Sequence, residues 1–144
     1  AAPMVRQMKS LGMAQKLLGG DAICTLELGK LGEAAVNDTV FCAQGGAILD
    51  KVAEGPTFKA KYKKRFNQDP DAYAASFYDQ TMFIVQSMQK TGSLDPEKVG
   101  AEMYKASYKG ITGAYAYDEK GNLKKAPITF YTFKNGAPVA LASN

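Results

Sequence analysis

The sequence predicts an α/β fold in which helices flank a parallel sheet. Helical and strand-like segments alternate over the first third of the chain, as they do where crossover helices join parallel strands. A block of amphipathic helices follows, and the last third changes to short β-rich runs that include a hairpin. The chain has 144 residues, of which 46% are hydrophobic and 22% are charged, so it has the composition of a folded globular protein.

The first third of the chain contains two helix–strand pairs. Pro3 lies in the first turn of the first helix, and Thr25 can cap the second helix. Gly19 and Gly20 end the first strand, and the second strand is rich in β-formers. The predicted elements are a helix over residues 3–11, a strand over 16–18, a helix over 26–34 and a strand over 39–43.

The middle of the chain is helical, and the tail is built of strands. Phe58, Tyr62 and Phe66 recur every four residues on the first middle helix. Asn135-Gly136 separates two β-rich runs and is the strongest hairpin signal in the sequence. Asp95, followed by Pro96, is the predicted cap of the third middle helix. The predicted elements are helices over residues 56–66, 71–90 and 96–106 and strands over 112–117, 128–133 and 139–141.

The long middle helix carries a wide apolar stripe, which predicts burial on more than one side. The stripe consists of Phe77, Tyr78, Met82, Ile84, Val85 and Met88. Three consecutive helices without strands between them indicate that these helices pack on something that this chain does not contain.

The composition favours binding over catalysis. The chain contains no histidine, which removes the usual general base, the commonest zinc ligand and every Ser-His or Cys-His pair. We find no nucleophile–base pair and no cofactor motif, so we expect neither an enzyme nor a bound cofactor. The net charge of +4 permits polyanion binding without signalling it, and we expect no nucleic-acid partner.

Three patterns resemble functional motifs but have simpler explanations. Gly29-Lys30 lacks the spacing of a phosphate-binding loop, and residues 118–122 lack ligands of a calcium loop and predict a β-turn. The densest basic cluster surrounds the aromatic residues of the helix over 56–66. The aromatic residues share one face and the cations occupy the others, which predicts a solvated amphipathic helix. The cluster consists of Lys59, Lys61, Lys63, Lys64 and Arg65.

Asp21 follows the first strand, at the position where open α/β sheets bind their ligands. Gly19 and Gly20 allow a ligand to approach the backbone closely, and Ala22 leaves that approach uncrowded. An aspartate that only caps a helix or closes a turn is the alternative interpretation. The residues alone leave both interpretations open.

The two cysteines, Cys24 and Cys42, are too few for a zinc site without histidine and too far apart for a redox Cys-x-x-Cys. They suit either one disulfide in an oxidising compartment or two buried thiols.

Several segments, taken in order, resemble the carboxy-terminal part of the type I periplasmic binding proteins. These are the branched-chain amino-acid (Leu/Ile/Val) receptors of ABC importers. Each segment is weakly specific alone, but together they cover nearly the whole chain. The matching segments are Met8 to Met13, Leu18 to Thr25, Phe41 to Gly46, Phe58 to Tyr62, Ala72 to Met88 with Tyr78-Asp79, Lys109 to Gly113, and Tyr117 to Tyr131.

The resemblance implies a two-lobed receptor that closes on a small amino acid without catalysing a reaction. Asp21 takes the position of the acidic residue that pairs with the ligand α-ammonium, with Gly20 and Ala22 beside it. Tyr73 matches an aromatic residue that borders the pocket for the ligand side chain. Cys24 and Cys42 fall on neighbouring segments of one lobe, where a disulfide is expected. The alternative function is a sensory or regulatory ligand-binding module of the same fold.

The resemblance also implies that the chain is a fragment of a longer receptor. Residues 1–44 would belong to the carboxy-terminal lobe, 45–116 to the helical layer of the amino-terminal lobe, and 117–144 to the returning hairpin. The expected partners are an amino acid and the membrane permease of an importer, in the periplasm after removal of an export signal. We expect the fragment to expose apolar surface unless it forms homo-oligomers, swaps segments or keeps its partner piece.

Overall fold

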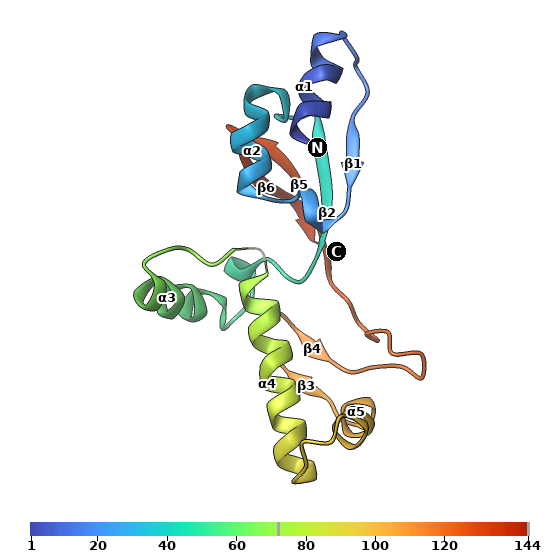
Figure 1. Cartoon of the computed structure of the whole chain (residues 1–144). Helices are drawn as coiled ribbons and strands as arrows, with labels where there is room; N and C mark the ends of the chain where they lie inside the picture. Colours follow the sequence, from blue (N-terminus) through green and yellow to red (C-terminus); the bar gives the residue numbers. More distant parts are fainter. Residues whose placement is uncertain (72, 144) are drawn as a thin grey trace. The chain divides into compact units, whose positions relative to one another are not determined.

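A computed structural model describes residues 1–71 and 73–143 and divides the chain into two compact units (Figure 1). Unit 1 contains Ala1–Gly45 and the segment that begins at Pro127, and unit 2 contains Gly46–Ala126. Unit 1 is therefore discontinuous in sequence, and the C-terminal segment completes it.

Unit 1 has the alternating helices and strands that the sequence predicts. The Oγ1 atom of Thr25 accepts a hydrogen bond of 3.1 Å from the Leu28 N–H, which confirms the predicted cap. A short 3-10 helix, η1, follows the first strand. The elements are α1 Ala2–Ser10, β1 Leu17–Gly19, η1 Asp21–Ile23, α2 Leu26–Gly32, η2 Glu33–Ala35, β2 Val40–Gly45, β5 Ile128–Lys134 and β6 Ala137–Ser143.

The sheet of unit 1 has the strand order β1-β2-β5-β6. Strands β1 and β2 are parallel, with Gly19 opposite Cys42, whereas β2–β5 and β5–β6 are antiparallel. The sheet is thus mixed, because the C-terminal hairpin joins the parallel pair. Asn135 and Gly136 connect β5 and β6 with φ values of 52° and 72°, as a two-residue hairpin turn requires.

The core of unit 1 lies on one face of this sheet. Val40 and Cys42 of β2 and Phe133 of β5 are fully buried there, and α1 and α2 contribute Val5 and Leu28. Burial alternates along β2, as expected for a strand that presents one face to a core.

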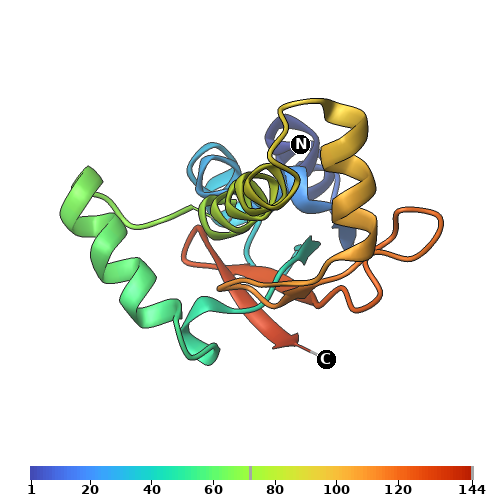
Figure 2. The ribbon, with the colours of Figure 1, turned by 90° about the horizontal axis from the view of Figure 1, so that it is seen from below.

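Unit 2 contains the helical block and a small two-stranded sheet. The Oδ1 atom of Asp95 accepts a hydrogen bond of 2.9 Å from the Glu97 N–H and caps α5 as predicted. In both views α3 lies on the other side of α4 from α5 (Figures 1 and 2). The elements are η3 Leu49–Lys51, α3 Gly55–Phe66, α4 Ala74–Thr91, α5 Pro96–Lys105, β3 Tyr108–Lys109 and β4 Ala114–Tyr115.

Helix α4 buries a different face from the one that its sequence predicts. Its buried residues are Ala75, Asp79, Phe83 and Ser87, one on each successive turn. The expected apolar stripe is largely exposed in the described chain, and Phe77 at 68% is its most open member. The physical reason is that α5 and the segment from Tyr108 to Tyr117 pack on α4 and leave its apolar stripe largely open. Among the described residues, no helix combines the length and apolar composition that a membrane span requires.

Candidate functional site

The turn that carries Asp21 begins where strand β1 ends. Gly19 is the last residue of β1, Gly20 precedes the 3-10 helix, and Asp21 is its first residue. Because β1 is parallel to β2, this turn lies at the carboxyl edge of the parallel pair, where α/β sheets bind ligands. The structure thus places Asp21 at the strand end that the sequence predicts.

The carboxylate of Asp21 is exposed and free of cationic partners in the described part of the chain. Its Oδ1 atom accepts a hydrogen bond of 2.9 Å from the Ala22 N–H. This bond within the turn leaves Oδ2 available, so the carboxylate can accept hydrogen bonds from a positively charged ligand group.

Space around the turn differs between its two glycines. A Cβ atom at Gly20 would have no heavy atom within 4 Å, so the approach to the backbone beside Asp21 is open. A Cβ at Gly19 would lie 2.4 Å from Cδ1 of Ile23, so a larger residue there would require the Ile23 side chain to move. Ala22 is exposed beside Asp21 and adds little bulk.

Cys24 and Cys42 form a disulfide, with their Cα atoms 5.7 Å apart. Cys24 directly follows η1, and Cys42 lies in the middle of β2. Both residues are buried, with 3% and 0% of their surfaces exposed. The bridge therefore connects the Asp21 turn to the sheet.

Gln44 is a polar residue of this edge that the sequence analysis missed. It lies near the carboxyl end of β2 and is 6% exposed, and its Nε2 group has no hydrogen-bond partner among the described residues. The signal was the alternation Val40, Cys42, Gln44, which places a polar side chain in the buried phase of a strand. A buried amide of this kind can donate hydrogen bonds to a ligand or to another protein segment.

Tyr73 belongs to unit 2, whereas Asp21 belongs to unit 1. It precedes α4, and its N–H donates a hydrogen bond of 3.0 Å to Oδ1 of Asp71. Its partly buried ring makes an edge contact with Phe77, with ring centroids 6.3 Å apart. Gly20, Asp21, Ala22 and the two cysteines lie together in unit 1, and Tyr73 is not part of that group.

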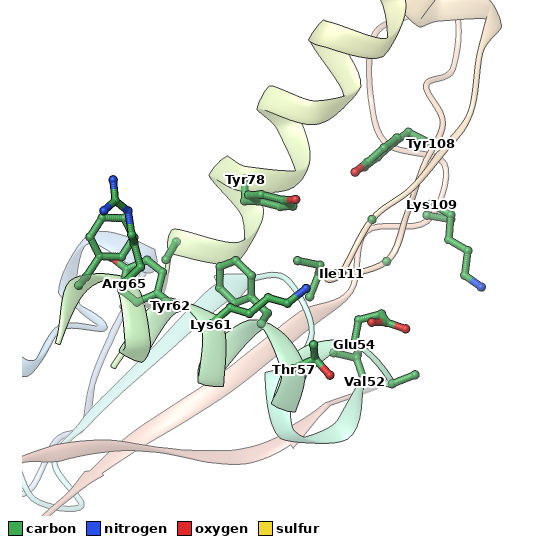
Figure 3. Close-up of a pocket in the computed structure, with 17 residues that line it drawn as sticks. Val52, Glu54, Thr57, Lys61, Tyr62, Arg65, Tyr78, Tyr108, Lys109 and Ile111 are labelled. Atoms are coloured by element: carbon green, nitrogen blue, oxygen red, sulfur yellow. The ribbon is translucent and has the colours of Figure 1, made fainter. Parts of the chain in front are cut away.

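Unit 2 contains a groove of about 1150 Å³ between α3, the start of α4 and the loop that joins β3 to β4 (Figure 3). Phe58 lines the groove, and the centroid of its ring lies 5.8 Å from that of Tyr62 and 5.7 Å from that of Tyr78. Burial raises the pKa of the Tyr108 phenol, and the charge of Asp79 raises it further. The sequence predicted the aromatic face of α3 but not the groove.

The basic cluster on α3 departs in part from its predicted arrangement. Lys59 pairs with Asp50 at 2.7 Å and Lys63 with Asp69 at 3.3 Å, as expected of a solvated face. Lys61 and Arg65, however, line the groove with the aromatic residues. The long side chains of Lys and Arg extend along the neighbouring apolar face of the helix. The spacing of residues in the sequence does not predict how far they extend.

Residues 118–122 form the β-turn that the sequence predicts. The Oδ1 atom of Asp118 accepts hydrogen bonds of 2.9 Å from the N–H groups of Lys120 and Asn122. The hydrogen bond from the Asn122 backbone N–H is the main reason that the pKa of the Asp118 carboxyl is lowered. Within residues 1–71 and 73–143, no cluster of three or more acidic or cysteine side chains has the arrangement of a metal site.

The sequence matches a family model of the periplasmic binding proteins over residues 1–138. Leu/Ile/Val-binding protein homolog 1 of Brucella abortus is 31% identical over 138 residues. The leucine-, isoleucine-, valine-, threonine- and alanine-binding protein of Pseudomonas aeruginosa is 26% identical over 137 residues. These matches cover 95% and 93% of this chain but only 36% and 35% of the relatives.

Solved structures show the same likeness. A leucine binding protein of Thermotoga maritima superposes with a TM-score of 0.84 at 26% identity, covering 99% of this chain and 41% of the other. The substrate binding protein of a branched-chain amino acid transporter from Streptococcus pneumoniae, solved with isoleucine, is alike in fold. Its TM-score is 0.79 at 22% identity, with 100% of this chain and 40% of the other covered.

Proposed function

Because the chain belongs to the periplasmic binding protein family, we propose that it is part of the substrate-binding component of an ABC importer for small amino acids. Branched-chain amino acids are the favoured ligands, since the Brucella and Pseudomonas relatives are named for them. Such a component binds its ligand in the periplasm without converting it and delivers it to a membrane permease.

This proposal depends on the carboxylate of Asp21, which is exposed at the carboxyl edge of β1 and β2 and has no cationic partner among the described residues. An α-ammonium group that leaves water loses its hydration, and a carboxylate with neighbouring acceptors must replace it. Asp21 supplies that carboxylate, and the open backbone at Gly20 and the small side chain of Ala22 leave room for the ligand.

Tyr73 is assigned a second role, as an aromatic wall for the ligand side chain. Its backbone N–H donates a hydrogen bond to Asp71, and the residue directly precedes α4, a helix of 18 residues. The start of this helix therefore fixes the backbone from which the ring projects. In the proposed receptor, residues 1–44 and the C-terminal hairpin belong to the carboxy-terminal lobe and residues 45–116 to the amino-terminal lobe. Residues 117–126, which the sequence assigns to the carboxy-terminal lobe, form part of unit 2. Closure of the lobes on the ligand then couples binding to docking on the permease.

The test is Asp21→Asn in the full-length receptor that carries this sequence. Titration calorimetry with leucine, isoleucine, valine and alanine identifies the tightest ligand of the parent protein. Removing the charge should weaken that ligand by about 2–5 kcal/mol, which is about 30-fold or more. Glu27→Gln makes the same charge change at an exposed position of α2 and should leave affinity within about twofold. Unchanged affinity in the Asp21→Asn variant would contradict the proposed function.

A further inference from the structure

Cys42 anchors both ends of the turn that carries Asp21. Gly19, the last residue of β1, is the partner of Cys42 in the parallel ladder. Cys24, which directly follows η1, is bonded to the same Cys42 through the disulfide. Residues 20–23 therefore form a short loop whose flanking residues, Gly19 and Cys24, are both attached to Cys42. Asp21 lies within this loop.

The other contacts that hold this turn are mostly local. The Ile23 N–H donates a hydrogen bond of 3.3 Å to the Gly20 carbonyl, and the Cys24 N–H donates one of 2.9 Å to the Asp21 carbonyl. Ile23 also packs against Gly19 at the end of β1 and against the core of unit 1, and it is the one residue of the turn between Gly20 and Ile23 that does so. Gly20, Asp21 and Ala22 are exposed, so core packing does not hold them.

From this geometry we infer that the Cys24–Cys42 disulfide positions the Asp21 carboxylate for the ligand ammonium. The inference rests on the proposed function of Asp21 and goes beyond it, because it assigns to the bridge an effect on affinity in addition to one on stability. Cys24 and Cys42 are positioning residues in this scheme, since they act through Asp21.

The physical basis is preorganisation. Without the bridge, the segment from Gly20 to Cys24 is held by its local hydrogen bonds and by the packing of Ile23, and the exposed Asp21 carboxylate samples more orientations. Apparent affinity falls in proportion to the fraction of molecules that hold the binding orientation. A decrease of that fraction to about one tenth weakens binding about tenfold.

A double-mutant cycle in the full-length receptor tests the coupling between the bridge and Asp21. The variants are C24A/C42A, Asp21→Asn and their combination, titrated with the tightest of leucine, isoleucine, valine and alanine. The alanine pair should weaken binding about tenfold in the parent but less than about twofold in the Asp21→Asn background. Equal weakening in both backgrounds is the behaviour of a bridge that only stabilises the fold, and it overturns the inference.

Two controls separate positioning from stability. Val5→Ala removes a fully buried group from the same core without touching the turn, and its affinity should stay within about twofold of the parent. A loss of affinity in this variant as large as that of the alanine pair overturns the inference. Reduction of the parent with dithiothreitol leaves both sulfur atoms in place and should reproduce the effect of the alanine pair. Full affinity in the reduced protein overturns the inference even if the alanine pair does not fold.

Amide hydrogen exchange of the 144-residue chain gives a readout that needs no ligand. The Ile23 and Cys24 amides should exchange faster in C24A/C42A than in the parent, and by a larger factor than the Gly29 amide of α2. An equal increase at all three amides overturns the inference. A full-length parent that binds none of the four amino acids overturns the proposed function as well, whereas a parent that binds them without coupling overturns this inference alone.

Discussion

Asp79 is fully buried in unit 2, and hydrogen bonds rather than a cation compensate its charge in the described chain. Its carboxylate accepts bonds of 2.8 Å from the N–H groups of Ile111 and Thr112 and from Oγ1 of Thr112. A buried carboxylate is tolerated only when such donors replace water. The bonds fix the loop between β3 and β4 against α4. This loop forms part of the groove wall in unit 2.

Gly110→Ala should disrupt that contact. A Cβ atom there would lie 2.4 Å from Cγ of Asp79, which forces the loop or the buried carboxylate to move and should cost about 1–3 kcal/mol of unfolding free energy. Gly100→Ala is the matched control, because the new methyl group would meet no described atom within 4 Å beyond the neighbouring backbone of its own helix. It should stabilise the chain by about 0.4–1 kcal/mol. Urea unfolding monitored by circular dichroism measures both effects, and equal stability of the two variants would refute the packing argument.

At the scale of elements, α4 has two unlike faces. Its buried face carries Phe83, which stacks on Tyr108 and Tyr117 at centroid distances of 5.5 and 6.1 Å. Its other face carries apolar side chains that remain exposed among the described residues, among them Phe77 at 68% and Ile84 at 38%. A helix with apolar residues nearly all round is typical of a buried element. This pattern supports the proposal that the chain is part of a larger receptor.

The two faces of α4 predict opposite outcomes for the same substitution. Phe83→Ala should destabilise the 144-residue chain by about 3–5 kcal/mol, because it removes a ring that is 1% exposed. Phe77→Ala, at 68% exposure, should change stability by less than about 0.5 kcal/mol. Chemical denaturation of both variants measures the difference. A large loss in Phe77→Ala would show that this face is covered in solution.

The sequence predicted these elements to different degrees, for physical reasons. Thr25, Asp95 and Asn135-Gly136 are local signals that act within a few residues, and the structure confirms each. The antiparallel pairing of β2 with β5 and the two-residue strand β3 were missed, because they depend on partners distant in sequence.

The candidate site was predicted to a similar extent. The position of Asp21 follows from a strand end and was predicted. The groove of unit 2 was missed, as was the buried Gln44 amide, whose Nε2 group has no hydrogen-bond partner among the described residues. Each depends on the residues that pack around it.

At the scale of the whole chain, each unit leaves large apolar side chains open to solvent. Large exposed apolar patches on a protein mark sites of interaction with other molecules or sites of aggregation. The chain spans 36% of the length of its Brucella relative, and we propose that the remainder of the receptor covers these residues. They include Leu18, Ile128, Phe130 and Leu141 in unit 1 and Phe66, Phe77, Met82 and Leu94 in unit 2.

The isolated 144-residue chain should therefore self-associate and bind an apolar dye. Sedimentation should show a mass that increases with concentration, and anilinonaphthalene sulfonate fluorescence should be higher than with the full-length receptor. Replacing Phe77 and Ile84 with lysine should reduce both signals without loss of helix. A chain that remains monomeric and dark with the dye would argue against the fragment assignment.

The interrupted sequence of unit 1 has a consequence for folding as the chain emerges, N-terminus first, into the compartment in which it folds. Strand β2 pairs with β5, so the sheet cannot be completed until residues 128–134 have emerged behind the whole of unit 2. During that interval one edge of β2 has no neighbour, and an exposed strand edge is a template for aggregation. A chain that pauses within unit 2 is thus more prone to aggregate than one that pauses after β6, and its need for chaperones should be greatest just before the hairpin emerges.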